Sequence, residues 1–179
     1  MDVISPTYES PKILIPAEAI LHEVKRIAQE LRTDYFGRNP LIIGILKGSF
    51  IFIADLIRLM EIPVQVEFVR FSSYGSGKKS SGRIKTIQGL EASVADRDVI
   101  IVDDIADTGL SLNHFIKSIQ RKKPASVKTC VLLDKPSCRK TGLTVDYVGI
   151  TIPDTFVVGY GLDCNEEFRQ LPHICCVEE

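Results

Sequence analysis

Short runs of consecutive apolar residues recur along the chain and predict strands that are buried on both faces of a sheet. The runs are Leu41–Leu46, Val99–Val102, Val127–Leu133 and Tyr147–Ile152. A further strand is predicted from Val64 to Phe71, where apolar and polar residues partly alternate. Because strands buried on both faces are typical of parallel sheets, the pattern favours a mostly parallel sheet.

Apolar residues at helical spacing lie between the predicted strands. One stripe follows Pro16 and comprises Ile20, Leu21, Val24, Ile27, Ala28 and Leu31. A second comprises Leu112, Phe115, Ile116 and Ile119, and another helix is predicted from about Phe50 to Met60. Amphipathic helices that alternate with buried strands predict an α/β fold with a mostly parallel central sheet flanked by helices.

The stretch from Ser72 to Gly82 is small, polar and rich in glycine, which predicts a mobile loop over residues 72–82. The stretch lacks the third glycine of a dinucleotide-binding fingerprint and the spacing of a P-loop. We therefore expect a lid over an active site rather than a phosphate cradle.

Composition narrows the class of protein. The 179 residues fit one domain, residues 1–179, and 45% hydrophobic residues suffice for a sizeable core. A net charge of −1, from 22 basic and 23 acidic residues, indicates neither a nucleic-acid nor a membrane partner. No signal peptide or membrane-spanning apolar stretch is recognised. Five cysteines without a paired framework indicate free thiols, and we expect a cytoplasmic protein.

The segment from Val99 to Gly109 carries the strongest chemical signal. Its polar residues, with one just beyond it, are Asp103, Asp104, Asp107, Thr108 and Ser111. Carboxylates at the carboxyl end of a strand can accept hydrogen bonds from sugar hydroxyls or hold a divalent cation. The following loop and helix start offer backbone N–H groups to an anion. The pattern suits a ligand with a phosphate and a polyhydroxy ring; an ordinary acidic turn with an aspartate cap is the alternative.

This segment resembles the phosphoribosyl-pyrophosphate signature of type I phosphoribosyltransferases. The resemblance implies that Asp103 and Asp104 contact the ribose hydroxyls and an associated Mg²⁺ ion. It also implies a 5-phosphate site made by Asp107, Thr108, Gly109, Leu110 and Ser111. The family's fold would add a small hood region built from the chain ends, and relatives form homodimers or homotetramers. Asp103 stands where many relatives have glutamate, and Ala106 replaces a bulkier residue, so affinity is in question more than the reaction.

Three further segments, Leu46–Phe50, Leu132–Pro136 and Ile152–Asp163, are similar to those of the hypoxanthine-guanine group of this family. For the purine, the resemblance implies stacking by Phe156, contact with the Val157 backbone, and a Lys135 ammonium on the 6-oxo oxygen. Taken singly, Phe156 would be a core residue and Lys135 a solvated loop residue.

The resemblance also implies ligands for the metal and for the pyrophosphate. Asp163 would belong to the purine-binding residues and would also hold a magnesium ion, as would Asp103 and Asp104. The pyrophosphate would be bound by Lys47, Gly48, Arg169, Ser73 and Tyr74. Relatives often carry a cis peptide before the residue that corresponds to Lys47. Taken singly, Arg169 would be an ordinary surface charge.

The reaction expected from the resemblance is displacement of pyrophosphate from 5-phosphoribosyl 1-pyrophosphate by N9 of hypoxanthine or guanine, giving IMP and/or GMP. Asp107 is placed to act as the general base that takes the purine proton. Two alternatives stay open at this point. One is a transferase that prefers xanthine, and the other is a regulator of the same fold that binds nucleic acid, for which this chain lacks a basic surplus.

Overall fold

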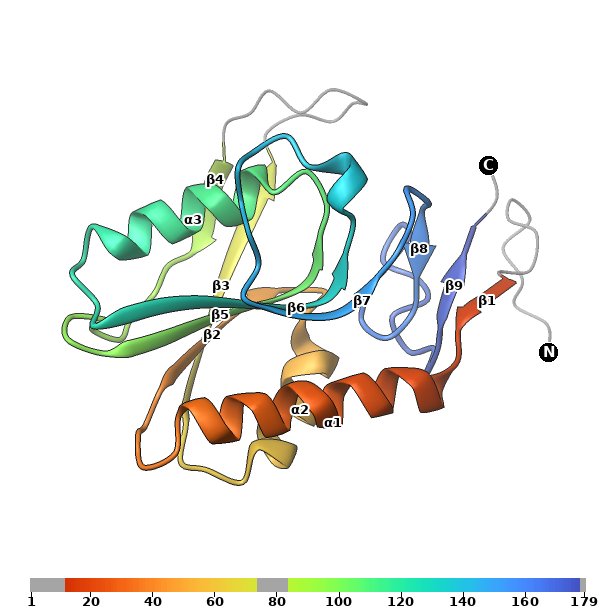
Figure 1. The fold of residues 1–179 in the computed structure, drawn as a ribbon. Coiled ribbons are helices and arrows are strands. Elements are labelled where there is room, and N and C mark those ends of the chain that lie inside the picture. The colour runs from red at the N-terminus through yellow and green to blue at the C-terminus, as the bar shows by residue number, and fades with distance from the viewer. Residues whose placement is uncertain (1–11, 74–83, 178–179) are drawn as a thin grey trace.

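A six-stranded sheet forms the centre of the molecule, with strand order β4-β3-β2-β5-β6-β7 (Figure 1). The computed structural model describes residues 12–73 and 84–177. Every neighbouring pair in the sheet is parallel except β3 with β4, at one edge. The strands are β2 Leu41–Leu46, β3 Gln65–Ser73, β4 Ile84–Gln88, β5 Asp98–Ala106, β6 Ser126–Asp134 and β7 Tyr147–Thr151.

Helices cover both faces of this sheet. The helices α1 Ala17–Asp34 and α2 Phe50–Met60 lie on one face, and α3 Leu110–Gln120 lies on the other (Figure 1). None of the helices in the described ranges is both long and apolar enough to cross a bilayer. The predicted α/β fold with a mostly parallel sheet flanked by helices is confirmed.

The alternation of side chains along the central strands explains why their apolar runs are continuous. Ile42 and Ile100 pack into the core beneath α1 and α2, whereas their neighbours Ile43 and Ile101 pack into the core beneath α3. All four side chains are inaccessible to solvent. Each strand therefore contributes to two cores, and the sheet that carries the polar residues at its carboxyl end is held rigidly from both sides.

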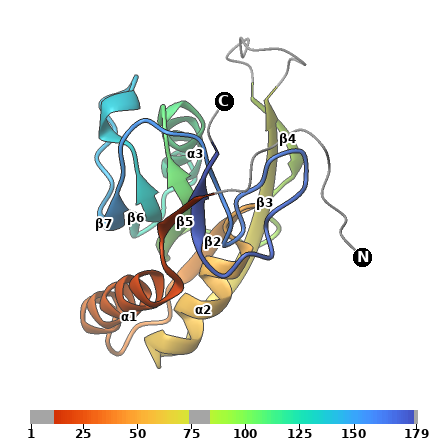
Figure 2. The same cartoon turned by 90° about the vertical axis from the view of Figure 1, so that its right-hand side faces the viewer.

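A second, three-stranded sheet lies beyond the carboxyl ends of the parallel strands (Figures 1 and 2). It has the order β1-β9-β8, with both pairs antiparallel, and is built from β1 Lys12–Ile15, β9 Ile174–Cys176 and β8 Val157–Val158. Segments from the two ends of the described chain thus pair directly, which is the hood expected from the resemblance. No disulfide joins the five cysteines, all of which lie in the described ranges.

The structure corrects the prediction in three places. The strand expected at residues 99–102 continues to Ala106, because β5 stays paired with β6 as far as Asp134. The antiparallel strand β4 was not predicted, and β3 extends into the glycine-rich stretch as far as Ser73. The rest of the predicted lid, residues 74–82 including Tyr74, lies outside the described residues.

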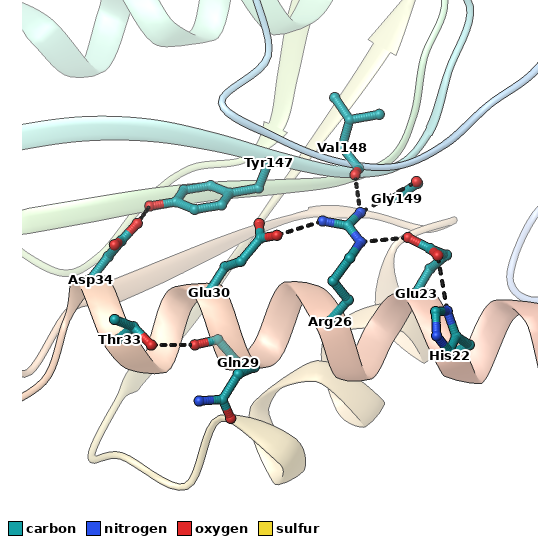
Figure 3. Close-up of polar contacts among 10 residues, drawn as sticks. All are labelled: His22, Glu23, Arg26, Gln29, Glu30, Thr33, Asp34, Tyr147, Val148 and Gly149. Carbon is teal, nitrogen blue, oxygen red and sulfur yellow. Dashed lines mark hydrogen bonds and ion pairs between the residues drawn. The ribbon is translucent and has the colours of Figure 1, made fainter.

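The exposed edge of the sheet at β7 is tied to α1 by Arg26 (Figure 3). Its guanidinium donates to the carbonyl oxygens of Val148 at 2.5 Å and Gly149 at 3.4 Å. The same group is held by Glu23 and Glu30 of α1, each at 2.7 Å. Edge-strand carbonyl groups are otherwise open to pairing with another chain, and here they are bound by a charged side chain.

Arg26→Ala is expected to lower the free energy of unfolding by about 1–2 kcal/mol, because the β7 carbonyl groups lose a charge-assisted donor. Urea denaturation of the purified variant measures the change. The matched control is Arg58→Ala, since Arg58 is 73% exposed and bonds only within α2 among the described contacts. Equal losses in the two variants would contradict a special role for the contact between α1 and β7.

Candidate active site

The two adjacent acids of β5 are positioned by the unequal lengths of the neighbouring strands. β2 pairs with β5 only as far as Val102, whereas β6 continues alongside to Ala106. Asp103 and Asp104 therefore belong to the sheet on one side and lie beside the turn that follows β2 on the other. A Cβ atom added to Gly48 in that turn would overlap the Asp104 carboxylate, so the two residues are in close contact.

Burial dominates the electrostatics of this acid pair. It raises the pKa of Asp103 well above the ordinary value, and the neighbouring Asp104 carboxylate raises it further. Burial likewise raises the pKa of Asp104, although hydrogen bonds to its carboxylate and the charge of Arg169 oppose this. The Asp104 carboxylate also accepts a hydrogen bond from the Ile105 backbone N–H at 2.9 Å. A bound cation or hydroxyl donors would stabilise the charged form of the pair.

The turn after β2 carries the Lys47 side chain and places the Gly48 backbone beside the Asp104 carboxylate. The peptide bond between Leu46 and Lys47 is cis. The turn is fixed by Ser49, which is fully buried and donates its hydroxyl to the Ile45 carbonyl oxygen at 2.6 Å. Gly161, from the hood side, packs against the Gly48 carbonyl oxygen. The turn is thus held between β5 and the segment that follows β8.

The loop from Asp107 to Ser111 leads directly into the N-terminus of α3. Gly109 caps the helix with φ of +74°, a conformation that favours glycine, and accepts a hydrogen bond from Asn113. Asp107 is exposed, and the Thr108 carbonyl oxygen accepts a hydrogen bond from the Lys140 backbone N–H at 3.0 Å. The first N–H groups of α3, around Ser111, have no acceptor within the helix, and a helix terminus of this kind can bind an anion.

A buried arginine that the sequence analysis did not identify supports this loop from behind. Arg139 forms an ion pair with Asp134 at the end of β6, and both side chains are nearly buried, at 11% and 15% exposed. The Arg139 side chain also packs against Gly109. Neither residue could be assigned from sequence, since an arginine five residues from an aspartate is no motif.

The residues assigned to the purine differ in exposure. Lys135 is only 6% exposed, and its backbone N–H donates to the Ala106 carbonyl oxygen at 2.9 Å. Phe156 is 49% exposed at the start of the hood, whereas Val157 is buried and pairs with Cys176. Lys135 is therefore not a solvated loop residue, and Phe156 is not a core residue. The connection that carries Lys135 is bonded to the last residue of β5, just before the loop of residues 107–111.

A charged network joins the turn after β2 to the segment after β8. The Arg169 guanidinium binds Asp163 at 2.8 Å and Glu166 at 3.0 Å, and it donates to the Gly161 carbonyl oxygen at 2.7 Å. Glu166 also binds the Lys47 ammonium at 2.8 Å. Hydrogen bonds from Lys47 and Arg169 lower the pKa of Glu166. Arg169, 18% exposed, is not an ordinary surface charge, and Glu166 was missed because its partner Lys47 is distant in sequence.

The three carboxylates assigned to a metal do not form one cluster. Within residues 12–73 and 84–177, no three acidic, histidine or cysteine side chains come together so that they could hold a metal ion. Asp163 is bonded instead to Arg169 and to the Glu166 backbone N–H, at 2.8 and 2.9 Å. Asp103 and Asp104 remain adjacent. The assignment of Asp103, Asp104 and Asp163 as magnesium ligands therefore stays a prediction.

Comparison with known proteins defines the class. The phosphoribosyl transferase domain family matches residues 13–165, a range that includes Asp103, Asp104, residues 107–111 and residues 152–163. The chain therefore belongs to the phosphoribosyltransferase family. Its fold is the one that the resemblance implied.

Relatives specify the group within the family. The hypoxanthine-guanine phosphoribosyltransferase of Aquifex aeolicus is 45% identical over 94% of this chain and 95% of that protein. A hypoxanthine-guanine phosphoribosyltransferase from Bacillus anthracis, known from a crystal structure, is 41% identical in sequence to this chain. The structural match covers 95% of this chain and all of the Bacillus anthracis chain, with a TM-score of 0.90. The chain also matches the bifunctional protein TilS/HprT of Listeria monocytogenes at 44% identity, and it spans 25% of that protein's length.

Proposed function

We propose that this chain transfers the 5-phosphoribosyl group of 5-phosphoribosyl 1-pyrophosphate to hypoxanthine or guanine, releasing pyrophosphate. The observation that carries the proposal is the arrangement around Asp104, where the turn at Gly48, the Arg169 charge and the end of β5 meet. An acid pair, a helix N-terminus and two cations suit the ribose, the 5-phosphate and the pyrophosphate. The names of the nearly full-length relatives support a 6-oxopurine as the base.

The reaction places positive charge on the anomeric carbon and negative charge on the leaving pyrophosphate. Lys47 and Arg169 would stabilise the leaving group as cations held in place before the reaction begins. Asp103 and Asp104 would accept hydrogen bonds from the ribose hydroxyls. Asp107 would take or share the purine proton as N9 attacks.

Magnesium fits the donors of this site as part of the proposal. Asp103 and Asp104 are hard oxygen ligands, and burial raises the pKa of both, so a bound cation would stabilise their charged form. Mg²⁺ usually binds one or two carboxylates together with substrate phosphates and water, which agrees with a site of two adjacent acids. When bound, the ion would reduce the negative charge on the pyrophosphate.

The proposed function is tested by giving the purified protein 5-phosphoribosyl 1-pyrophosphate, MgCl₂ and one base at a time. The expected result is formation of IMP from hypoxanthine or of GMP from guanine. Chromatography of the nucleotide product measures it. Faster product formation with xanthine would show that xanthine is the preferred base and would contradict the assignment of hypoxanthine or guanine. The absence of nucleotide with all purines, together with salt-sensitive binding of RNA or DNA, would replace the enzyme by a regulator.

Lys135→Ala is expected to lower kcat/KM for hypoxanthine by about tenfold to a hundredfold, because the 6-oxo oxygen loses a charged donor. Turnover of adenine should not fall, so discrimination between the two bases should narrow. Lys122→Ala, at an exposed lysine after α3, is the matched control. Unchanged kcat/KM for hypoxanthine in the Lys135 variant would remove this residue from the base contact.

A further inference from the structure

The Glu166 carboxylate lies between the two cations that are proposed to bind pyrophosphate. One oxygen binds the Lys47 ammonium at 2.8 Å, and the other binds the Arg169 guanidinium at 3.0 Å. Lys47 and Arg169 come from different parts of the chain, the turn after β2 and the segment after β8. A single carboxylate therefore bridges two cationic side chains that come from different segments.

The backbone around Glu166 is shaped to place this carboxylate. Asn165 and Glu166 both have positive φ, +52° and +67°, and the Glu166 backbone N–H donates to Asp163 at 2.9 Å. Positive φ is uncommon for residues other than glycine, so this tight turn is a specific local structure. The turn brings Glu166 to Lys47 across 119 residues of sequence.

The exposure of these groups shows which contact is exchangeable. The Glu166 side chain is 63% exposed and Lys47 is 40% exposed, so their ion pair is well solvated and weak. Arg169, in contrast, is 18% exposed and retains Asp163 and the Gly161 carbonyl oxygen as partners if Glu166 leaves. A phosphate group could replace Glu166 without leaving Arg169 unpaired. Within the described ranges, Lys47 has no second carboxylate at ion-pair distance.

We propose that Glu166 is an internal counter-ion that occupies the cationic part of the pyrophosphate site and is displaced when pyrophosphate binds. This proposal rests on the proposed function, because that function places the pyrophosphate at Lys47 and Arg169. Competition from Glu166 weakens the binding of pyrophosphate and so favours its release as a product. Between turnovers the carboxylate also provides Lys47 with an ion-pair partner.

The test is the affinity for inorganic pyrophosphate, measured by isothermal titration calorimetry at fixed MgCl₂ for wild type and Glu166→Gln. Glutamine keeps the size of the side chain and removes its charge. The dissociation constant is expected to fall by about threefold to tenfold in the variant, since two solvated ion pairs no longer compete with the ligand. Glu167→Gln is the matched control, because Glu167 is exposed and forms no ion pair in the described structure; its affinity should stay within about twofold of wild type.

Two outcomes would overturn the proposal. Unchanged affinity in Glu166→Gln would show that the carboxylate does not compete with pyrophosphate. Weaker affinity would show that Glu166 instead aligns Lys47 and Arg169 for binding. Steady-state kinetics provide a second readout: the variant should have a lower KM for 5-phosphoribosyl 1-pyrophosphate and stronger inhibition by pyrophosphate, whereas a folding defect would lower the apparent kcat and leave that KM unchanged.

The calorimetric result separates this proposal from the proposed function. Tighter pyrophosphate binding by Glu166→Gln in a protein that converts no purine would support the counter-ion and contradict the transferase. Nucleotide formation by a wild type whose pyrophosphate affinity matches that of the variant would support the transferase and contradict the counter-ion. A wild type that binds no pyrophosphate at all would contradict the counter-ion as well.

Discussion

Asp107→Asn is expected to lower kcat by about 10²–10⁴-fold, the usual contribution of a general base. Asp107 is exposed at the loop between β5 and α3, after the acid pair and before the helix N-terminus. It therefore stands where the ribose-phosphate end of the substrate would meet the purine. Asparagine keeps the shape of the side chain but cannot accept a proton at neutral pH. Single-turnover measurements with hypoxanthine give the rate of the chemical step.

The control for this prediction is Asp96→Asn. Asp96 is exposed and has φ of +57°, a conformation that asparagine also tolerates. This variant should retain wild-type kcat and stability. Full turnover in Asp107→Asn would exclude Asp107 as the general base, whereas an unchanged kcat with a raised KM would limit it to substrate binding.

Gly48→Ala is expected to lower kcat/KM by about 10²-fold or more, because the new methyl group would overlap the Asp104 carboxylate. Either the acid or the turn must move, and both belong to the proposed site. The turn cannot move freely, since Gly161 already packs against the Gly48 carbonyl oxygen and Ser49 is bonded to β2. Kinetics with 5-phosphoribosyl 1-pyrophosphate as the varied substrate measure the effect.

Gly142→Ala provides the comparison, because a Cβ atom at Gly142 would meet nothing within 4 Å and its backbone is not in the left-handed region. That variant should match wild type in kcat/KM and in urea denaturation. Wild-type kinetics in Gly48→Ala would show that the contact between the turn and Asp104 is not needed for turnover. Urea denaturation of the same variant distinguishes a local change at the site from a general loss of stability.

The parts of the fold that local sequence determines were predicted well. The helix α2 was predicted at its observed bounds, and the buried strand β2 was predicted from one apolar run. In both elements the apolar pattern results directly from burial in the core. It can therefore be recognised without knowing which other elements they contact. The strand β4 gave no such signal, because it is a short antiparallel edge strand that depends on its pairing with β3.

Contacts between distant segments could not be predicted from the pattern of residues alone. The acids of β5 were recognised as a pair, but the burial that raises the pKa of Asp103 depends on the strands and turns around it. Glu166 is exposed and acidic, and nothing in its local sequence indicates Lys47 as its partner. The Arg139–Asp134 pair likewise depends on tertiary packing, here against Gly109.

The strand pairing of the hood has a consequence for the order in which parts of the protein can fold during synthesis. Its middle strand, β9, comes last among the strands and pairs with both β1 and β8. The parallel strands β2 and β5 and the loop of residues 107–111 leave the ribosome before β9 does. A nascent chain can therefore begin to form the central part of the six-stranded sheet while β1 and β8 still lack their shared partner. The three-stranded sheet of the hood is completed only after β9 has been synthesised.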